Sequence, residues 1–94
     1  MLRINVNDSP DQTSLVIEGK LMGPWVKALE ACWLSIARKK PGSAVTVNLA
    51  EVSFVDDAGR ELLAQMCRQG VTIIPNGLLI TAIVEEIEAR VGGE

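Results

Sequence analysis

The order of strand-like and helix-like segments constrains the fold of this chain more than any other feature. The first segment has apolar residues at every second position, a polar turn follows it, and the apolar run Leu15–Ile17 comes next, which together predict a β-hairpin. Three segments of helical period follow, and short β-type runs separate them. The predicted strands are 2–6, 14–18, 44–49, 52–55 and 71–74, and the predicted helices begin at Pro24, near Ala58 and near Leu79.

This order, ββαβ(β)αβα, predicts a single α/β domain over residues 1–94. Crossovers through helices join parallel strands, so we expect a mixed sheet of four or five strands with three helices packed against it. Each predicted helix has one apolar face. These faces contain Trp25, Val26, Leu29, Cys32, Trp33 and Ile36; Gly59, Leu62, Leu63 and Met66; and Ile80, Ile83, Val84, Ile87 and Val91. Leu34, Leu78 and Leu79 fall outside these faces.

The composition excludes several classes of function. The formal net charge is −3, which argues against a nucleic-acid binder. The chain has no His, the commonest general base near neutral pH and the commonest metal ligand. Cys32 and Cys67 are far apart in sequence, so a disulfide framework or a zinc site is not expected. We also expect no secretory leader and no membrane span, and therefore a cytoplasmic protein.

A basic run, Arg38-Lys39-Lys40, stands at the end of the first predicted helix. Cations at that end complement the helix dipole, which is the favoured interpretation, and phosphate binding is the alternative.

The most informative segment is Val52–Leu63, where an apolar run leads directly into two carboxylates and then a helix. The start of a helix has unpaired N–H donors, so Asp56 is expected to cap it and Asp57 to add a second anion. Gly59 allows another element to approach closely. Both acids can be explained as helix-start residues alone. Two adjacent carboxylates are too few for a magnesium or calcium site, and their side chains diverge too far for a catalytic pair.

With these features the chain resembles the STAS domain, which is named for sulfate transporters and anti-sigma factor antagonists. The resemblance covers nearly the whole chain. The matching segments are Leu15–Leu21, Val45–Leu49, Phe54–Gly59 followed by Leu62 and Leu63, and Gly70–Ile74. It implies a STAS-like mixed sheet with the three α-helices on one side, in a bacterial protein that takes part in signalling or transcription regulation.

In bacterial STAS domains, a partner kinase that is also an anti-sigma factor phosphorylates a hydroxyl residue after the motif Asp. The resemblance assigns Asp56 to the motif Asp, Gly59 to the motif Gly and Asp57 to the phospho-acceptor position, with Ala58 next. Asp57 cannot be phosphorylated by a serine kinase, so the usual switch is absent there and a fixed negative charge replaces it. Met22 stands where relatives often carry an Asp after Gly-x-Leu. Ser53 is expected to pack or cap rather than to serve as a substitute acceptor.

These observations favour a non-catalytic domain, with no cofactor or metal, that docks to an anti-sigma or kinase-like protein. The expected partner-binding residues are Asp56, Asp57, Ala58, Gly59, Arg60, Glu61 and Ala64. One alternative is a small STAS subunit of a membrane transport complex, which would contact a transporter subunit through Leu34, Leu78 and Leu79 without inserting into the membrane. Nucleotide binding is less favoured because no P-loop is present. A homodimer is also an open alternative.

Overall fold

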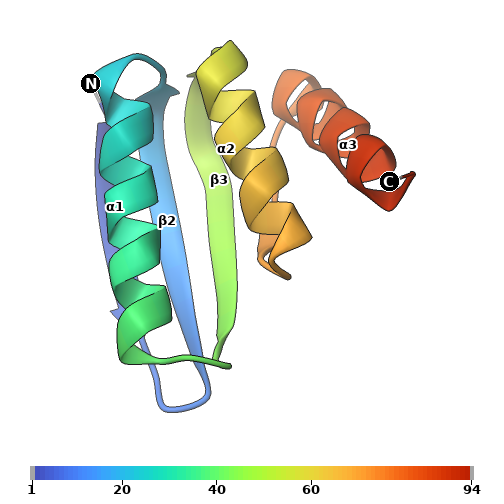
Figure 1. Cartoon of the computed structure of the whole chain (residues 1–94). Coiled ribbons are helices and arrows are strands. Elements are labelled where there is room, and N and C mark those ends of the chain that lie inside the picture. The colour runs from blue at the N-terminus through green and yellow to red at the C-terminus, as the bar shows by residue number, and fades with distance from the viewer. Residues whose placement is uncertain (1, 94) are drawn as a thin grey trace.

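The computed structural model describes residues 2–93 and shows an α/β domain with a mixed four-stranded sheet and three helices. In Figure 1 the helices stand side by side in chain order, with α2 between α1 and α3. The elements are β1 (Leu2–Asp8), β2 (Gln12–Leu21), α1 (Pro24–Lys39), β3 (Ala44–Val55), α2 (Asp57–Arg68), β4 (Thr72–Ile74) and α3 (Leu78–Gly92).

The strands lie in the sheet in the same order as in the chain, β1-β2-β3-β4. The hairpin of β1 and β2 is antiparallel, and the turn between them closes with a hydrogen bond from the Ser9 N–H to the Gln12 carbonyl oxygen at 2.9 Å. β2 pairs with β3, and β3 with β4, in parallel, as expected for strands joined through helices. The predicted hairpin and parallel crossovers are therefore confirmed.

The prediction of separate strands at 44–49 and 52–55 is wrong, because the two runs belong to the single strand β3. The pairing with β2 shifts by one residue between Asn48 and Glu51, which leaves an extra residue in β3. In that irregular stretch the Asn48 side-chain oxygen accepts a hydrogen bond from the Ala50 N–H at 2.8 Å. A bulge of this kind interrupts the apolar alternation without ending the strand.

The core lies between one face of the sheet and the helices. Alternate residues of β2 and β3 point into it, among them Leu15, Ile17 and Val47, all with no exposed surface. Four predicted helix residues, Gly59, Leu62, Leu63 and Met66, are buried on α2. On α1 the buried face is narrower than the predicted one, because Trp25 is 37% exposed and Cys32 and Ile36 are only half-buried. On α3 the first four predicted residues are buried and Val91 is half-buried.

α3 compensates for the shortness of β4. β4 pairs only with Thr46–Asn48, which leaves the second half of β3 without a strand partner on that side. α3 packs against α2 and contacts β3 there. Within residues 2–93, no helix combines the length and the apolar character needed to cross a membrane.

Gly59 sets how closely α2 approaches the sheet. A Cβ at this position would lie 2.8 Å from the Leu21 carbonyl oxygen and 2.8 Å from Cγ1 of Val55. Both distances are shorter than van der Waals contact, and the Leu21 oxygen belongs to the backbone and cannot rotate away. The sequence-based expectation of a close approach at Gly59 is confirmed.

Gly59→Ala should therefore reduce the free energy of unfolding by about 1–3 kcal/mol, because the new methyl group overpacks the contact with β2 and β3. Gly92→Ala is the matched control, since nothing lies within 4 Å of its added Cβ. The control should be neutral or stabilising by up to about 1 kcal/mol. Urea unfolding of the three proteins measures the difference, and equal stability of both variants would contradict the role assigned to Gly59.

Candidate functional site

The candidate site lies at the end of the sheet where the parallel strands β2 and β3 both terminate. Leu21 pairs with Val55 in the last register position of the two strands. The chain then enters α1 through Met22 and Gly23, and enters α2 through Asp56. Two strand-to-helix junctions are thus neighbours in space, which is a common place for functional sites in sheets of this type.

Asp56 connects the two junctions. Its Oδ1 accepts a hydrogen bond from the Gly59 N–H at 2.7 Å and caps α2. Its Oδ2 accepts a second bond, at 3.0 Å, from the N–H of Gly23, the residue that precedes α1. Its own N–H donates to the Leu21 carbonyl oxygen at 3.1 Å. The cap was predicted from sequence, whereas the bond to Gly23 requires knowing that the two junctions meet.

These bonds also affect the ionisation of Asp56. The N–H of Gly23, and then the N–H of Gly59, hold the pKa of the Asp56 carboxyl below its ordinary value of 3.8. The carboxylate is therefore charged at neutral pH. Because its pKa is lower in the folded state, it stabilises the fold above pH 3.8, and this contribution is lost as the pH falls toward the folded-state pKa.

Asp57 is the first residue of α2, and its side chain is exposed at the helix start. Ala58 follows and is also exposed. An anion in the first turn is favoured by the unpaired N–H groups and the dipole of the helix. The position expected for Asp57, at the mouth of a helix and outside the core, is confirmed.

The remaining predicted partner-binding residues are not all accessible. Ala64 has no exposed surface and Gly59 is buried, so neither can contribute a side chain to an exposed surface. Ala64 was expected to contact a partner, but it is buried in a helix whose flank is covered by α3. The expectation of an exposed Ala64 is wrong for this reason.

Arg60 and Glu61 both reach toward α3. Nη1 of Arg60 lies 3.9 Å from Oε1 of Glu86, and Nη2 of Arg90 lies 2.7 Å from Oε1 of Glu61. Arg60 Nε is buried without a hydrogen-bond partner among residues 2–93. These two side chains therefore tie α2 to α3, and Glu61 remains exposed at the same time.

A shallow groove between α1 and α2 completes the candidate site. From α2 it is lined by Ala58, Glu61, Leu62, Gln65 and Arg68, and from α1 by Val26 and Glu30. Sequence reasoning missed the contribution of α1. The predicted alternation of strands and helices was a usable signal, since two consecutive crossovers place their helices side by side.

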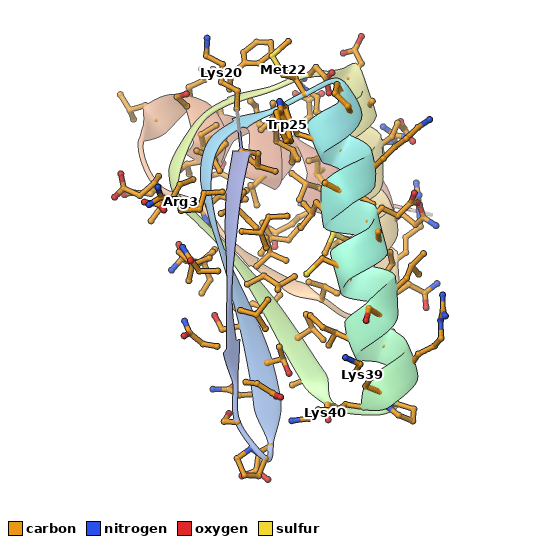
Figure 2. The ribbon with its side chains drawn as sticks, turned by 90° about the vertical axis from the view of Figure 1, so that its left-hand side faces the viewer. Arg3, Lys20, Met22, Trp25, Lys39 and Lys40 are labelled. Carbon is orange, nitrogen blue, oxygen red and sulfur yellow. The ribbon has the colours of Figure 1, made fainter. Side chains whose placement is uncertain are left out.

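Exposed apolar side chains accompany this end of the sheet. Met22, Trp25 and Phe54 are each more than one-third exposed. Figure 2 shows Met22 and Trp25 at the same end of the molecule as Lys20, which pairs with Phe54 across the strands. Sequence reasoning assigned Trp25 to the core and so missed it as a surface residue.

Ser53 does not replace the missing hydroxyl at the start of α2. Ser53 lies on β3, where its hydroxyl is 3.5 Å from the Gly19 carbonyl oxygen, and it does not stand at the helix start. In the part of the chain from 2 to 93, no group of three or more His, Cys, Asp and Glu side chains is arranged to hold a metal ion.

Comparison with known proteins identifies the fold. No protein-family model and no curated protein matches this chain. A crystal structure of a protein called Mglu has a TM-score of 0.62 and 26% identity, over 74% of this chain and 18% of that one. A structure of Mglu in its native form has a TM-score of 0.56 and 24% identity, over 73% of this chain and 21% of that one. The chain therefore spans about one-fifth of the length of Mglu.

An uncharacterised protein of the DUF3478 family, from Shewanella loihica PV-4, is described as having a SpoIIAA-like fold. It has a TM-score of 0.56 and 19% identity, over 83% of this chain and 70% of that one. The present chain has the same SpoIIAA-like fold, with its mixed four-stranded sheet and three helices.

The role of Asp56 can be tested through stability and its pH dependence. Asp56→Ala removes both acceptors and should lower the unfolding temperature by about 4–8 °C at pH 7. Asp56→Asn keeps one side-chain oxygen and should lose less. The difference between the wild type and Asp56→Asn should shrink as the pH falls below 3.8. Thermal unfolding followed by circular dichroism measures each value.

Asp57→Asn is the matched control for this experiment, because it removes a neighbouring charge and leaves the bonds to Gly23 and Gly59 in place. A loss of stability as large as that of Asp56→Ala would contradict the bridging role of Asp56.

Proposed function

We propose that this chain is a non-catalytic STAS-type domain, similar to an anti-sigma factor antagonist, that docks to a protein partner through the start of α2. The observation that carries the proposal is the exposed carboxylate of Asp57 at the first position of α2. It stands where the resemblance to STAS domains puts a phosphorylatable hydroxyl. The SpoIIAA-like fold supports the same assignment.

The chemistry of the surface indicates the kind of partner. Glu30 and Glu61 line the α1–α2 groove together with Arg68, and the exposed Asp57 precedes the groove residue Ala58 at the start of α2. Trp25 lies two residues after Gly23, which is hydrogen-bonded to Asp56, so an aromatic anchor adjoins the acidic surface. Interfaces commonly combine such an anchor with a charged rim. We infer a partner with basic or donor-rich groups around an apolar pocket.

A fixed carboxylate has a consequence for regulation. A phosphate at this position would add nearly two negative charges and could be removed, whereas Asp57 carries one charge permanently. Under this proposal, docking is not switched by phosphorylation at position 57.

The docking surface can be tested in the native host with an affinity-tagged chain and quantitative mass spectrometry of co-purifying proteins. Asp57→Lys should deplete the specific partner at least about tenfold, because it reverses the charge at the centre of the surface. Glu88→Lys, an equal charge change on the exposed face of α3, should retain the partner. Equal recovery with the wild type and Asp57→Lys would contradict the proposed surface.

Asp57→Ser separates the regulatory hypothesis from other docking roles. If the partner is an anti-sigma kinase, the serine restores an acceptor at the helix start, and the variant should gain one phosphate when mixed with that partner and ATP. The wild type should gain none at position 57. Intact-mass spectrometry and peptide mapping measure this, and the wild type offers no hydroxyl acceptor within Asp56–Gly59. An unmodified Asp57→Ser protein would contradict a kinase partner.

A second candidate function is that of a small subunit in a membrane transport complex. It is favoured by Leu78 and Leu79, which are 94% and 61% exposed at the start of α3. Two adjacent exposed leucines form an apolar patch that another subunit can cover. Replacement of both by Gln should leave stability unchanged and release the chain from a membrane-bound complex in this case. Retention in that complex would contradict this candidate.

A further inference from the structure

The strand order separates the charges of the chain in space. Residues 2–50 contain six Lys or Arg and four Asp or Glu, a net charge of +2. Residues 51–93 contain three and seven, a net charge of −4. Because the sheet follows chain order, the side built from β1, β2 and α1 is basic, and the side built from α2, β4 and α3 is acidic. The acidic docking surface proposed above belongs to the second group.

The basic side ends in a free strand edge. β1 has seven residues and pairs only with β2. In an antiparallel pair, half of the backbone N–H and C=O groups of an edge strand point away from the partner and are free to pair with another chain. The opposite edge is different, because β4 has three residues and α3 adjoins the rest of that side. Figure 2 looks onto the β1 edge.

A groove beside this edge exposes apolar side chains on the helix side of the sheet. Along β1, the residues that face the helices become more exposed, from 9% at Leu2 to 47% at Val6. Val6 pairs with Leu15, whose side chain is fully buried, so the helix layer stops short of the end of β1. A cavity of about 300 Å³ lies there between β1 and the last turns of α1. Its lining includes Val6, Thr13, Cys32, Ile36, Lys39 and Lys40.

The cations around the groove are only partly neutralised. Lys40 binds the Asp8 carboxylate and donates to the Ser9 carbonyl oxygen at 3.0 Å. Lys39 adds a second positive charge beside the same carboxylate. Lys20 is exposed at the opposite end of this side, as Figure 2 shows. Asp8, Asp11 and Glu18 lie on the same hairpin, and Glu18 stands 3.6 Å from Arg3. Among residues 2–93, the cations of this edge outside an ion pair are Lys39 beside the groove and Lys20 at the far end.

We propose that the β1 edge and the adjoining groove, formed by Val6, Cys32 and Ile36, bind an extended acidic peptide segment of another protein. The segment adds a fifth strand beside β1, inserts one apolar side chain into the groove and places its carboxylates near Lys39 and Lys20. Backbone pairing supplies affinity in this mode of recognition, and the alternate side chains supply specificity. A second copy of this chain fits less well, since two β1 edges would bring the same cations together.

The proposal is independent of the docking surface on α2, because it concerns the β1 edge and the last turns of α1 and a partner of opposite charge. A suitable probe is a fluorescein-labelled heptapeptide with blocked ends and alternating Glu and Val. Fluorescence anisotropy at low salt should show saturable binding with a Kd on the order of 100 µM, which weakens as salt is added. A peptide with Lys in place of Glu should not bind, nor should one with a central Pro, which cannot complete the strand pairing.

Two protein variants and a control locate the site. Lys39→Glu should weaken binding about tenfold, because it reverses the charge at the mouth of the groove. Val6→Gln replaces an apolar side chain of the groove at an exposed position without changing its charge, and should also weaken binding. Lys27→Glu is the matched control, since it makes the same charge change on α1 at an exposed position opposite Ile36. It should leave the Kd within about twofold.

Amide hydrogen exchange with the heptapeptide bound should show added protection within β1, Leu2–Asp8. Four results would overturn the proposal: no saturable binding of the heptapeptide, equal effects of Lys39→Glu and Lys27→Glu, protection confined to α2 and α3, or concentration-dependent dimerisation through β1. Circular dichroism of each variant confirms that a loss of binding does not come from unfolding.

Discussion

The carboxylate of Asp56 is the contact on which the functional end of this domain depends. One oxygen receives the N–H of Gly59 inside α2, and the other receives the N–H of Gly23 just before α1. A single side chain thereby orders two helix starts that are more than thirty residues apart in sequence. With two acceptor positions already used internally, Asp56 organises the surface, and Asp57 is the carboxylate that faces solvent.

The topology explains how one small domain can present two surfaces of opposite charge. In a sheet whose strands lie in chain order, neighbours in sequence remain neighbours in space. A difference in charge between the two halves of the chain is then a difference between the two sides of the molecule. The start of α2 and the β1 edge are consequently distinct in both charge and position, and one partner need not exclude another.

Much of the fold could be predicted from the sequence because the relevant signals are local. The helical period of α2 reports a buried face directly, and the alternation at Leu2, Ile4 and Val6 reports the strand, although Val6 itself is exposed. The division of β3 was wrong for an equally local reason. The bulge near Ala50 shifts by one residue the positions of β3 that face the core. In the sequence, this break in the alternation of apolar residues looks like the end of one strand and the start of another.

The candidate site could be predicted only in part. Helix-start chemistry identifies Asp56 and Asp57 without any knowledge of the fold. The burial of Ala64 and the bond between Asp56 and Gly23 depend on how α3 and α1 flank α2, and no local pattern encodes these contacts. The exposure of Trp25 has the same origin, because an apolar residue at the first turn of a helix can project beyond the end of the sheet it packs on.

The chain-ordered sheet also bears on how the protein acquires its structure during synthesis. Each strand pairs with the strand that precedes it in the sequence, which has already been synthesised. The hairpin can form first as the chain leaves the ribosome. β3 can then pair with β2 while α1 packs on the sheet, and β4 can pair with β3 while α2 packs beside α1. Since β4 is short, the last strand to join is also the smallest, and α3 packs against α2 and β3. α3 therefore covers part of β3 on the side of the sheet that is made last.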